Sequence, residues 1–163
     1  MSECLEVRYR RARAWLESVR ACAAMIESTT RELRALQDAK LDVCPGRPRG
    51  HGSGGAAQTH SDPTAREAEA RITQLEVAMA ETQARLDECQ DSVGRCLEVL
   101  ERMRYDLTPR HAKAIGLYYV DLAPTWSEVA DEMGCSRTSL WDIRCDAYEW
   151  IERNCRNIPY SRT

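Results

Sequence analysis

Cysteine and histidine are the residue types with the greatest potential for chemistry in this chain, which has eight of the first and three of the second. The cysteines form no C-x-x-C pair, and their scatter differs from that of a zinc site or a disulfide framework. They are Cys4, Cys22, Cys44, Cys89, Cys96, Cys135, Cys145 and Cys155. We interpret them as small buried hydrophobic residues. His111 stands apart on a predicted helix, and the sequence has neither a Gly-rich phosphate loop nor an H-E-x-x-H motif. The sequence therefore predicts neither an enzyme nor a cofactor.

A second group of candidate ligands lies in the segment "CPGRPRGHGSGGAAQTHSDP". Arg47 and Arg49 could meet a phosphate, and Cys44 with His51 and His60 could hold a metal ion. Arginines among glycines are usually solvated, and this irregular spacing is a poor zinc pattern. We expect a flexible linker without a bound metal.

A third group of polar side chains follows Gly134. Leu140, Ile143, Ala147 and Trp150 recur at the three- and four-residue spacing of a buried helix face. The same helix leaves seven other residues, counting its cap, on the outside: Ser136, Arg137, Thr138, Ser139, Trp141, Asp142 and Arg144.

Two further helices must position this third one. Thr108 and Pro109 are expected to open the first, with the Thr108 hydroxyl as its cap. Thr125 and Glu128 form a capping-box pattern at the start of the second, which is short. Gly134 can adopt the left-handed conformation that ends the short helix, and Ser136 can cap the next. A turn of about three residues fixes the angle between two helices, as a helix-turn-helix requires.

Two seven-residue repeats precede these helices, and most of their core positions are apolar. The first comprises Leu5, Arg8, Ala12, Trp15, Val19, Cys22, Ile26, Thr29, Leu33, Leu36, Lys40 and Val43. The second comprises Ile72, Leu75, Met79, Thr82, Leu86, Cys89, Val93, Cys96, Leu100, Met103 and Leu107. Two such stripes joined by a loop favour an antiparallel helical hairpin, although pairing between molecules satisfies the same pattern. Because the seam contains Thr, Cys and Lys, we expect further helices or a second protomer to thicken it, and we expect a homo-oligomer.

The predicted fold is therefore all-α, with a coiled-coil hairpin followed by a three-helix domain. The divisions are a first coiled-coil helix at 1–43, a flexible loop at 44–63, a second coiled-coil helix at 64–107, a helix-turn-helix domain at 108–155 and a tail at 156–163. No apolar run approaches the roughly 20 residues that cross a bilayer, and the start of the chain is charged. We expect a cytoplasmic protein without a membrane partner.

The run "LTPRHAKAIGLYYV…TWSEVADEMGCSRTSLWDIRCDAYEWI" resembles region four of bacterial sigma factors. That region has a hydrophobic-Tyr pair followed by an S-x-x-E-[IV]-A-x-x-[LM]-G-x-S core. The matching positions are Thr125 or Ser127, Glu128, Val129, Ala130, Met133, Gly134 and Ser136. The order of hairpin, variable loop and helix-turn-helix resembles phage-encoded transcriptional regulators of the RinA and ArpU type.

This resemblance implies a sequence-specific regulator whose third helix enters the major groove of double-stranded DNA. Arg137 and Arg144 would fork onto guanine or clamp a phosphate. Ser127, Ser136 and Thr138 would bond phosphates. The remaining DNA-contacting positions carried over from the family are Ser139, Trp141 and Asp142. RNA polymerase is a further partner that the resemblance implies.

The charge balance departs from this expectation. The chain has a formal net charge of −3, and residues 105–163 have seven Lys or Arg against nine Asp or Glu. DNA-binding modules are usually basic. Two other interpretations therefore stay open: an interaction protein that uses the helix-turn-helix as a compact bundle, and a packaging adaptor like a small terminase subunit.

Overall fold

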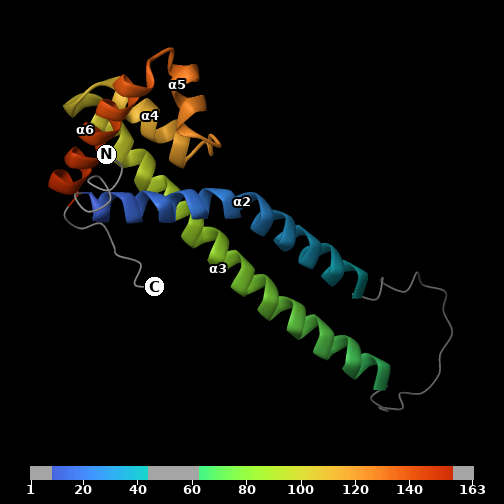
Figure 1. Cartoon of the computed structure of the whole chain (residues 1–163). Helices are drawn as coiled ribbons and strands as arrows, with labels where there is room; N and C mark the ends of the chain where they lie inside the picture. The colour runs from blue at the N-terminus through green and yellow to red at the C-terminus, as the bar shows by residue number, and fades with distance from the viewer. Residues whose placement is uncertain (1–8, 44–62, 156–163) are drawn as a thin grey trace, which may run out of the picture. The chain divides into compact units, whose positions relative to one another are not determined.

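The computed structural model describes residues 9–43 and 63–155, and within these ranges the regular structure is entirely helical. Figure 1 shows the helices, which are α2 (Arg10–Val43), α3 (Pro63–Asp106), α4 (Pro109–Tyr119), α5 (Trp126–Met133) and α6 (Arg137–Asn154). The all-α prediction is confirmed. None of these helices has an apolar stretch long enough to cross a membrane. The candidate ligands of segment 44–62 lie outside the described residues.

The chain divides into two compact units, and the division passes through both long helices. One unit contains Met1–Glu27 and Asp87–Thr163, and the other contains Ser28–Leu86. The sequence instead predicts a boundary after residue 107. The two units are called the core unit and the distal unit below.

The distal unit is an antiparallel pair formed by the end of α2 and the start of α3. Lys40 bonds Glu76 at 2.7 Å, and Glu32 bonds Arg85 at 3.1 Å. From Glu32 to Lys40 the residue numbers on α2 rise, while those of their partners on α3 fall from Arg85 to Glu76. The two segments therefore run antiparallel. Both ion pairs are exposed, and such pairs contribute at most about 1 kcal/mol each.

The seam of the distal unit follows the predicted repeats. None of the described repeat positions of this unit is fully exposed: Thr29, Leu33, Leu36, Lys40, Val43, Ile72, Leu75, Met79, Thr82 and Leu86. Thr29 and Thr82 are buried despite their hydroxyls. Arg85 satisfies the hydroxyl of Thr82 with a hydrogen bond of 3.1 Å. The sequence pattern allows the two stripes to pair within one molecule or between molecules. In the structure they pair within one molecule.

The core unit has one principal hydrophobic core to which four helices contribute. Its buried members include Trp15, Leu16, Val19, Cys96, Leu100, Met103, Ala112, Ile115, Tyr119, Ala147, Tyr148 and Ile151. Figure 1 shows α4 and α6 beside the first turns of α2 and the last turns of α3. Helices α4 and α6 thus share this core with the ends of the hairpin.

Glu152 joins the start of α2 to the end of α6. Its carboxylate accepts a hydrogen bond from the backbone N–H of Ala12 at 2.9 Å and another from Nε of Arg11 at 2.8 Å. The first N–H groups of a helix have no partner within the helix, so an acceptor from elsewhere stabilises them. This contact helps to hold α6 against the hairpin.

Candidate nucleic-acid interface

The turn between α5 and α6 contains three residues, as the sequence predicts. Gly134 has φ 60° and ψ 40°, in the left-handed region. The N–H of Cys135 bonds the carbonyl of Ala130 at 3.0 Å, and the N–H of Gly134 bonds that of Asp131 at 3.1 Å. These two bonds form a Schellman motif, which ends a helix abruptly.

Ser136 caps α6 as predicted. Its hydroxyl oxygen accepts a hydrogen bond from the N–H of Ser139 at 3.1 Å, and the two hydroxyls also lie 2.9 Å apart. Because these groups already bond each other, a ligand would have to share them. At the other end of the motif, the Thr125 hydroxyl accepts from the N–H of Glu128 at 3.2 Å and begins α5.

The first turn of α6 presents an exposed polar rim consisting of Arg137, Thr138 and Ser139, with Asp142 one turn further on. Arg137, Thr138 and Asp142 make no hydrogen bond or ion pair with any residue in the part of the chain that the structure describes. Their donors and acceptors are therefore directed to solvent. Ser127 is half-buried in the first turn of α5.

Arg144 occupies a different environment from the one the sequence predicts. Its guanidinium carbon lies 3.9 Å from the ring centre of Trp126 and 5.5 Å from that of Trp141. Its Nε is buried without a hydrogen-bond partner among the described residues. The expectation that Arg144 is freely available on the outer face is therefore wrong. The side chain lies along the protein because the aromatic rings attract the cation.

Trp126 belongs to a stack that begins on the hairpin. Its ring lies 4.0 Å from the ring of Tyr118 with an interplanar angle of 15°. On the other face of Tyr118 lies the guanidinium of Arg20, 4.2 Å from the ring centre. Arg20, Tyr118, Trp126 and Arg144 thus form three successive contacts from α2 to α6, and we call these four residues the aromatic stack.

Arg20 also bonds the backbone of the last turn of α4 and of the loop that follows it. It donates to the carbonyl of Tyr118 and, at 3.1 Å, to the carbonyl of Ala123. Cations near the last carbonyls of a helix are favourable because those groups carry partial negative charge. The hairpin therefore fixes the link between α4 and α5, and through the stack it fixes the position of α6.

A small second core holds the helix-turn-helix together. Ala114, Val129, Ala130 and Leu140 are buried here, one or two from each of α4, α5 and α6. The prediction that Val129, Ala130 and Leu140 face inward is confirmed. Thr138 and Asp142 are each two residues from Leu140 and so lie on the opposite side of α6, which means that the burial of Leu140 turns these two residues outward.

The start of α4 differs from the prediction in one respect. Thr108 precedes Pro109 as expected, but its hydroxyl makes no capping bond to the backbone. It bonds Nδ1 of His111 at 2.8 Å, while Nε2 of the same ring lies 3.6 Å from Asp146 on α6. The imidazole competes for the hydroxyl, so His111 has a local structural role.

Tyr119 and Tyr148 form a buried polar pair that the sequence pattern did not reveal as a pair. Their hydroxyls lie 2.8 Å apart, and the residues are 1% and 2% exposed. Burial raises the pKa of Tyr119 well above its usual range, and Tyr148 raises it further. The two hydroxyls satisfy each other inside an apolar core, as buried polar groups must.

The interpretation of the cysteines as small buried residues holds for two of the six that the structure describes. Cys89 and Cys96 are buried, Cys22, Cys135, Cys145 and Cys155 are half-buried, and all six are free. Burial raises the pKa of Cys96 to about 12, with a smaller effect of Cys155. No group of His, Cys, Asp and Glu side chains within the described ranges is arranged to hold a metal ion.

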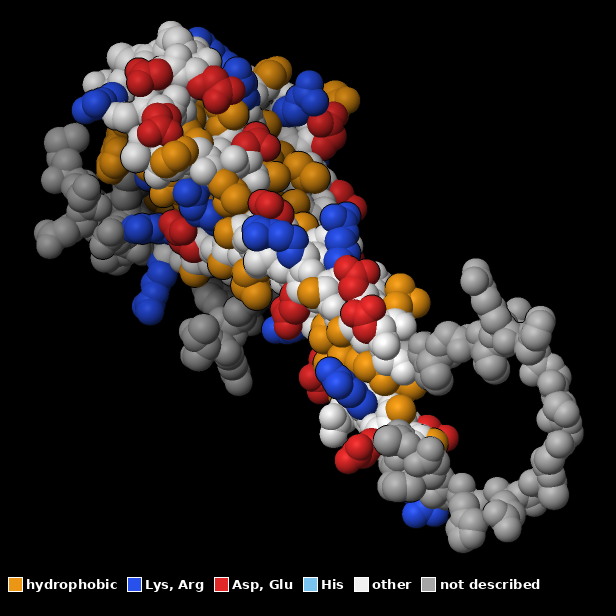
Figure 2. All heavy atoms as spheres, turned by 90° about the vertical axis from the view of Figure 1, so that its right-hand side faces the viewer, with side chains coloured by type: hydrophobic (Ala, Val, Ile, Leu, Met, Phe, Trp, Pro, Cys, Tyr) orange, Lys and Arg blue, Asp and Glu red, His pale blue; other side chains and the backbone are white. Residues whose placement is uncertain are grey.

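Charges of both signs surround the rim. Asp131, Glu132 and Asp142 are exposed near the turn. On the face drawn in Figure 2, Lys and Arg side chains alternate with Asp and Glu side chains. Any nucleic acid at this rim would therefore meet local cations and not a broad basic surface.

Comparisons with known protein families, characterised proteins and solved structures found no significant match. The geometry of the rim and of the turn therefore carries the functional argument.

Proposed function

We propose that the chain is a DNA-binding transcriptional regulator of the phage-encoded type, which reads duplex DNA with the first turn of α6. The observation that carries this proposal is the exposed rim beside a rigid three-residue turn, with Arg137 and Thr138 bonded to no described residue. A helix of this kind can enter the major groove while the preceding helix braces it. Such a regulator would act in the cytoplasm.

The residues of the rim differ in the contacts that they can make. Arg137 can donate two parallel hydrogen bonds to a guanine edge or a phosphate. Thr138 can donate to a phosphate, and Ser127, Ser136 and Ser139 can do so where their hydroxyls are accessible. Asp142 can accept a hydrogen bond from a cytosine amino group but repels phosphate.

Arg144 has a positioning role in this proposal. Its contact with Trp126 at 3.9 Å places it on the side of α6 that faces the protein. Trp141, which lies within reach of the same cation, is half-buried. Both residues would orient the rim and not read bases.

The charge balance requires a second source of affinity. One acidic module binds DNA weakly, but linking two modules makes the second binding event intramolecular. We propose that a homo-oligomer formed through the hairpin, or contact with RNA polymerase, supplies this gain. Leu41 and Val77 of the distal unit are exposed, and a second copy could cover these apolar side chains.

The test begins with selection of preferred duplexes from a random pool by the full-length protein. Fluorescence anisotropy then compares the selected duplex with an unselected one at two salt concentrations, and light scattering gives the oligomeric state. A fourfold rise in salt should weaken binding by about 100-fold if about four phosphates are contacted. Recovery of no preferred sequence, with no salt-dependent binding in any assembly state, would refute the proposal.

One observation favours a second candidate, an interaction protein whose helix-turn-helix contacts no DNA. One of the two arginines expected to read bases is held against Trp126, and residues 105–163 are acidic overall. Under this alternative the rim would be a protein contact. Absence of DNA binding together with stable oligomerisation would support it.

A further inference from the structure

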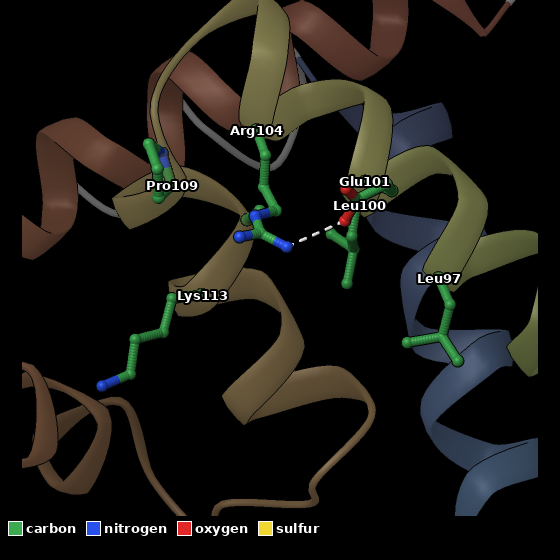
Figure 3. Close-up of a pocket in the computed structure, with 7 residues that line it drawn as sticks. Leu97, Leu100, Glu101, Arg104, Pro109 and Lys113 are labelled. Atoms are coloured by element: carbon green, nitrogen blue, oxygen red, sulfur yellow. Dashed lines mark hydrogen bonds and ion pairs between the residues drawn. The ribbon is translucent and has the colours of Figure 1, made fainter.

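A groove lies where the end of α3 meets the start of α4, away from the residues of the rim. It has a volume of about 470 Å³, and its lining residues are Leu97, Leu100, Glu101, Arg104, Pro109, Ala112 and Lys113. Figure 3 shows the side chains of Leu97, Leu100 and Arg104 extending from α3 into the same space, with Lys113 projecting from α4. All of these residues belong to the core unit.

The floor of the groove is apolar, and its edge is cationic. Leu97 is 51% exposed, which is unusual for a leucine at the edge of a core, and Leu100 and Ala112 are buried beside it. Arg104 bonds Glu101 at 2.9 Å, so one cation is already paired. Lys113 is exposed and has no partner in the part of the chain that the structure describes.

Helix α4 is unusual in its charges. Its sequence, PRHAKAIGLYY, contains Arg110 and Lys113 but no Asp or Glu, whereas every other described helix contains carboxylates. Both cations lie near the N-terminal end, where the helix dipole is positive and favours anions. This arrangement opposes helix stability, and an anion from a partner would relieve the repulsion.

We infer that this groove binds an acidic segment of a partner protein, which inserts an apolar side chain beside Leu97 and places a carboxylate near Lys113. The inference is based on charge complementarity. Lys113 on α4 is a cation with no partner among the described residues, and it lines the same groove as the exposed Leu97, although the whole chain has a net charge of −3. An amphipathic helix commonly binds a partner by placing its apolar face in a hydrophobic groove.

Duplex DNA fits the groove less well. A phosphate would be brought next to Leu97, which offers no hydrogen bond, and next to the carboxylate of Glu101. No groove residue belongs to the rim of α6. The inference therefore does not depend on DNA binding, and the two can fail separately.

The test titrates the isotope-labelled full-length protein with a short synthetic helical peptide of Leu, Glu and Ala, and follows backbone amide signals by NMR. Signals of Leu97–Arg104 and Arg110–Lys113 should shift. A peptide with Gln in place of Glu and one with Ala in place of Leu should each bind about tenfold more weakly.

Protein variants locate the site. Lys113→Glu and Leu97→Ala should each lower the affinity for the Leu/Glu peptide by about tenfold. Arg95→Glu, which changes an exposed residue elsewhere on α3, should leave this affinity unchanged. Circular dichroism establishes that each variant is folded. The inference is overturned if the Leu/Glu peptide does not shift these signals, if the Gln peptide binds equally well, or if Lys113→Glu weakens DNA binding and leaves peptide binding intact.

Discussion

The guanidinium of Arg144 lies 3.9 Å from the ring centre of Trp126, which joins the middle of α6 to the start of α5. Trp126 in turn stacks on Tyr118, which contacts Arg20 on α2. The sequence predicts that this arginine contacts DNA, whereas in the structure its side chain packs between α6 and α5 and helps to orient α6. The aromatic stack also makes the orientation of that helix depend on the hairpin.

Replacing Arg144 by Ala should lower the free energy of unfolding by about 1–2 kcal/mol, because a partly buried cation–π contact and the packing of its stem are both lost. Arg144→Met retains most of the packing and removes the buried Nε that has no partner, so it should cost less. Urea denaturation measures both changes. A loss below about 0.5 kcal/mol for Arg144→Ala would mean that the stack does not hold the helices.

Gly134→Ala should destabilise the protein by about 1 kcal/mol, because an L side chain is unfavourable at its positive φ. Apart from its chain neighbours, a Cβ at this position would meet nothing within 4 Å, so the cost comes from the local backbone conformation and not from packing against other residues. Gly94→Ala is the matched control, since that helical Cβ would also meet nothing within 4 Å. It should stabilise α3 by about 0.5–1 kcal/mol. Thermal melts that show the same sign for both changes would contradict this account of the turn.

The tyrosine pair predicts strong coupling between two substitutions. Tyr119→Phe or Tyr148→Phe alone leaves one buried hydroxyl without its partner at 2.8 Å, and each should cost about 1–3 kcal/mol. The double variant should cost less than the sum of the two, because no unpaired hydroxyl remains. A double-mutant cycle by chemical denaturation measures this coupling. Additive losses would show that the hydroxyls do not depend on each other.

The raised pKa of Cys96 predicts that the protein becomes less stable at alkaline pH. The folded pKa of this thiol is raised to about 12 from an ordinary value of 9.0, so the native state holds the proton more tightly than the unfolded state. The resulting stabilisation is complete below the unfolded pKa and is lost as the pH rises from there through the folded pKa. The difference in unfolding free energy between the native protein and Cys96→Ala should therefore fall between about pH 9 and about pH 12. A constant difference would show that this thiol is not desolvated.

The elements of the fold were predictable because their signals are local and periodic. The repeats from Ala12 to Val43 and from Ile72 to Leu107 follow the seam, since a regular helix converts spacing directly into a face. Gly134 and Ser136 were also predictable, because helix ends require particular backbone and capping groups.

Contacts between distant residues were not predictable in this way. The position of Arg144 depends on Trp126, and the hydroxyl of Thr108 is taken by His111. Leu122 adopts a positive φ of 62° beyond α4, although leucine is unfavourable there. The loop must link Tyr118 to Trp126 across the stack, and tertiary contacts override the local preference.

Of the rim residues, Arg137 should contribute most to DNA reading from the first turn of α6. We predict that Arg137→Ala weakens binding to the selected duplex by about 10-fold or more, as expected for loss of a forked contact, and changes unfolding free energy by less than about 0.5 kcal/mol. Arg153→Ala removes the same charge from the other end of α6, where Arg153 pairs with Glu149, and should leave DNA affinity nearly unchanged. Anisotropy titrations in which both variants bind DNA equally well, or in which neither differs from the native protein, would contradict the proposed role of the rim.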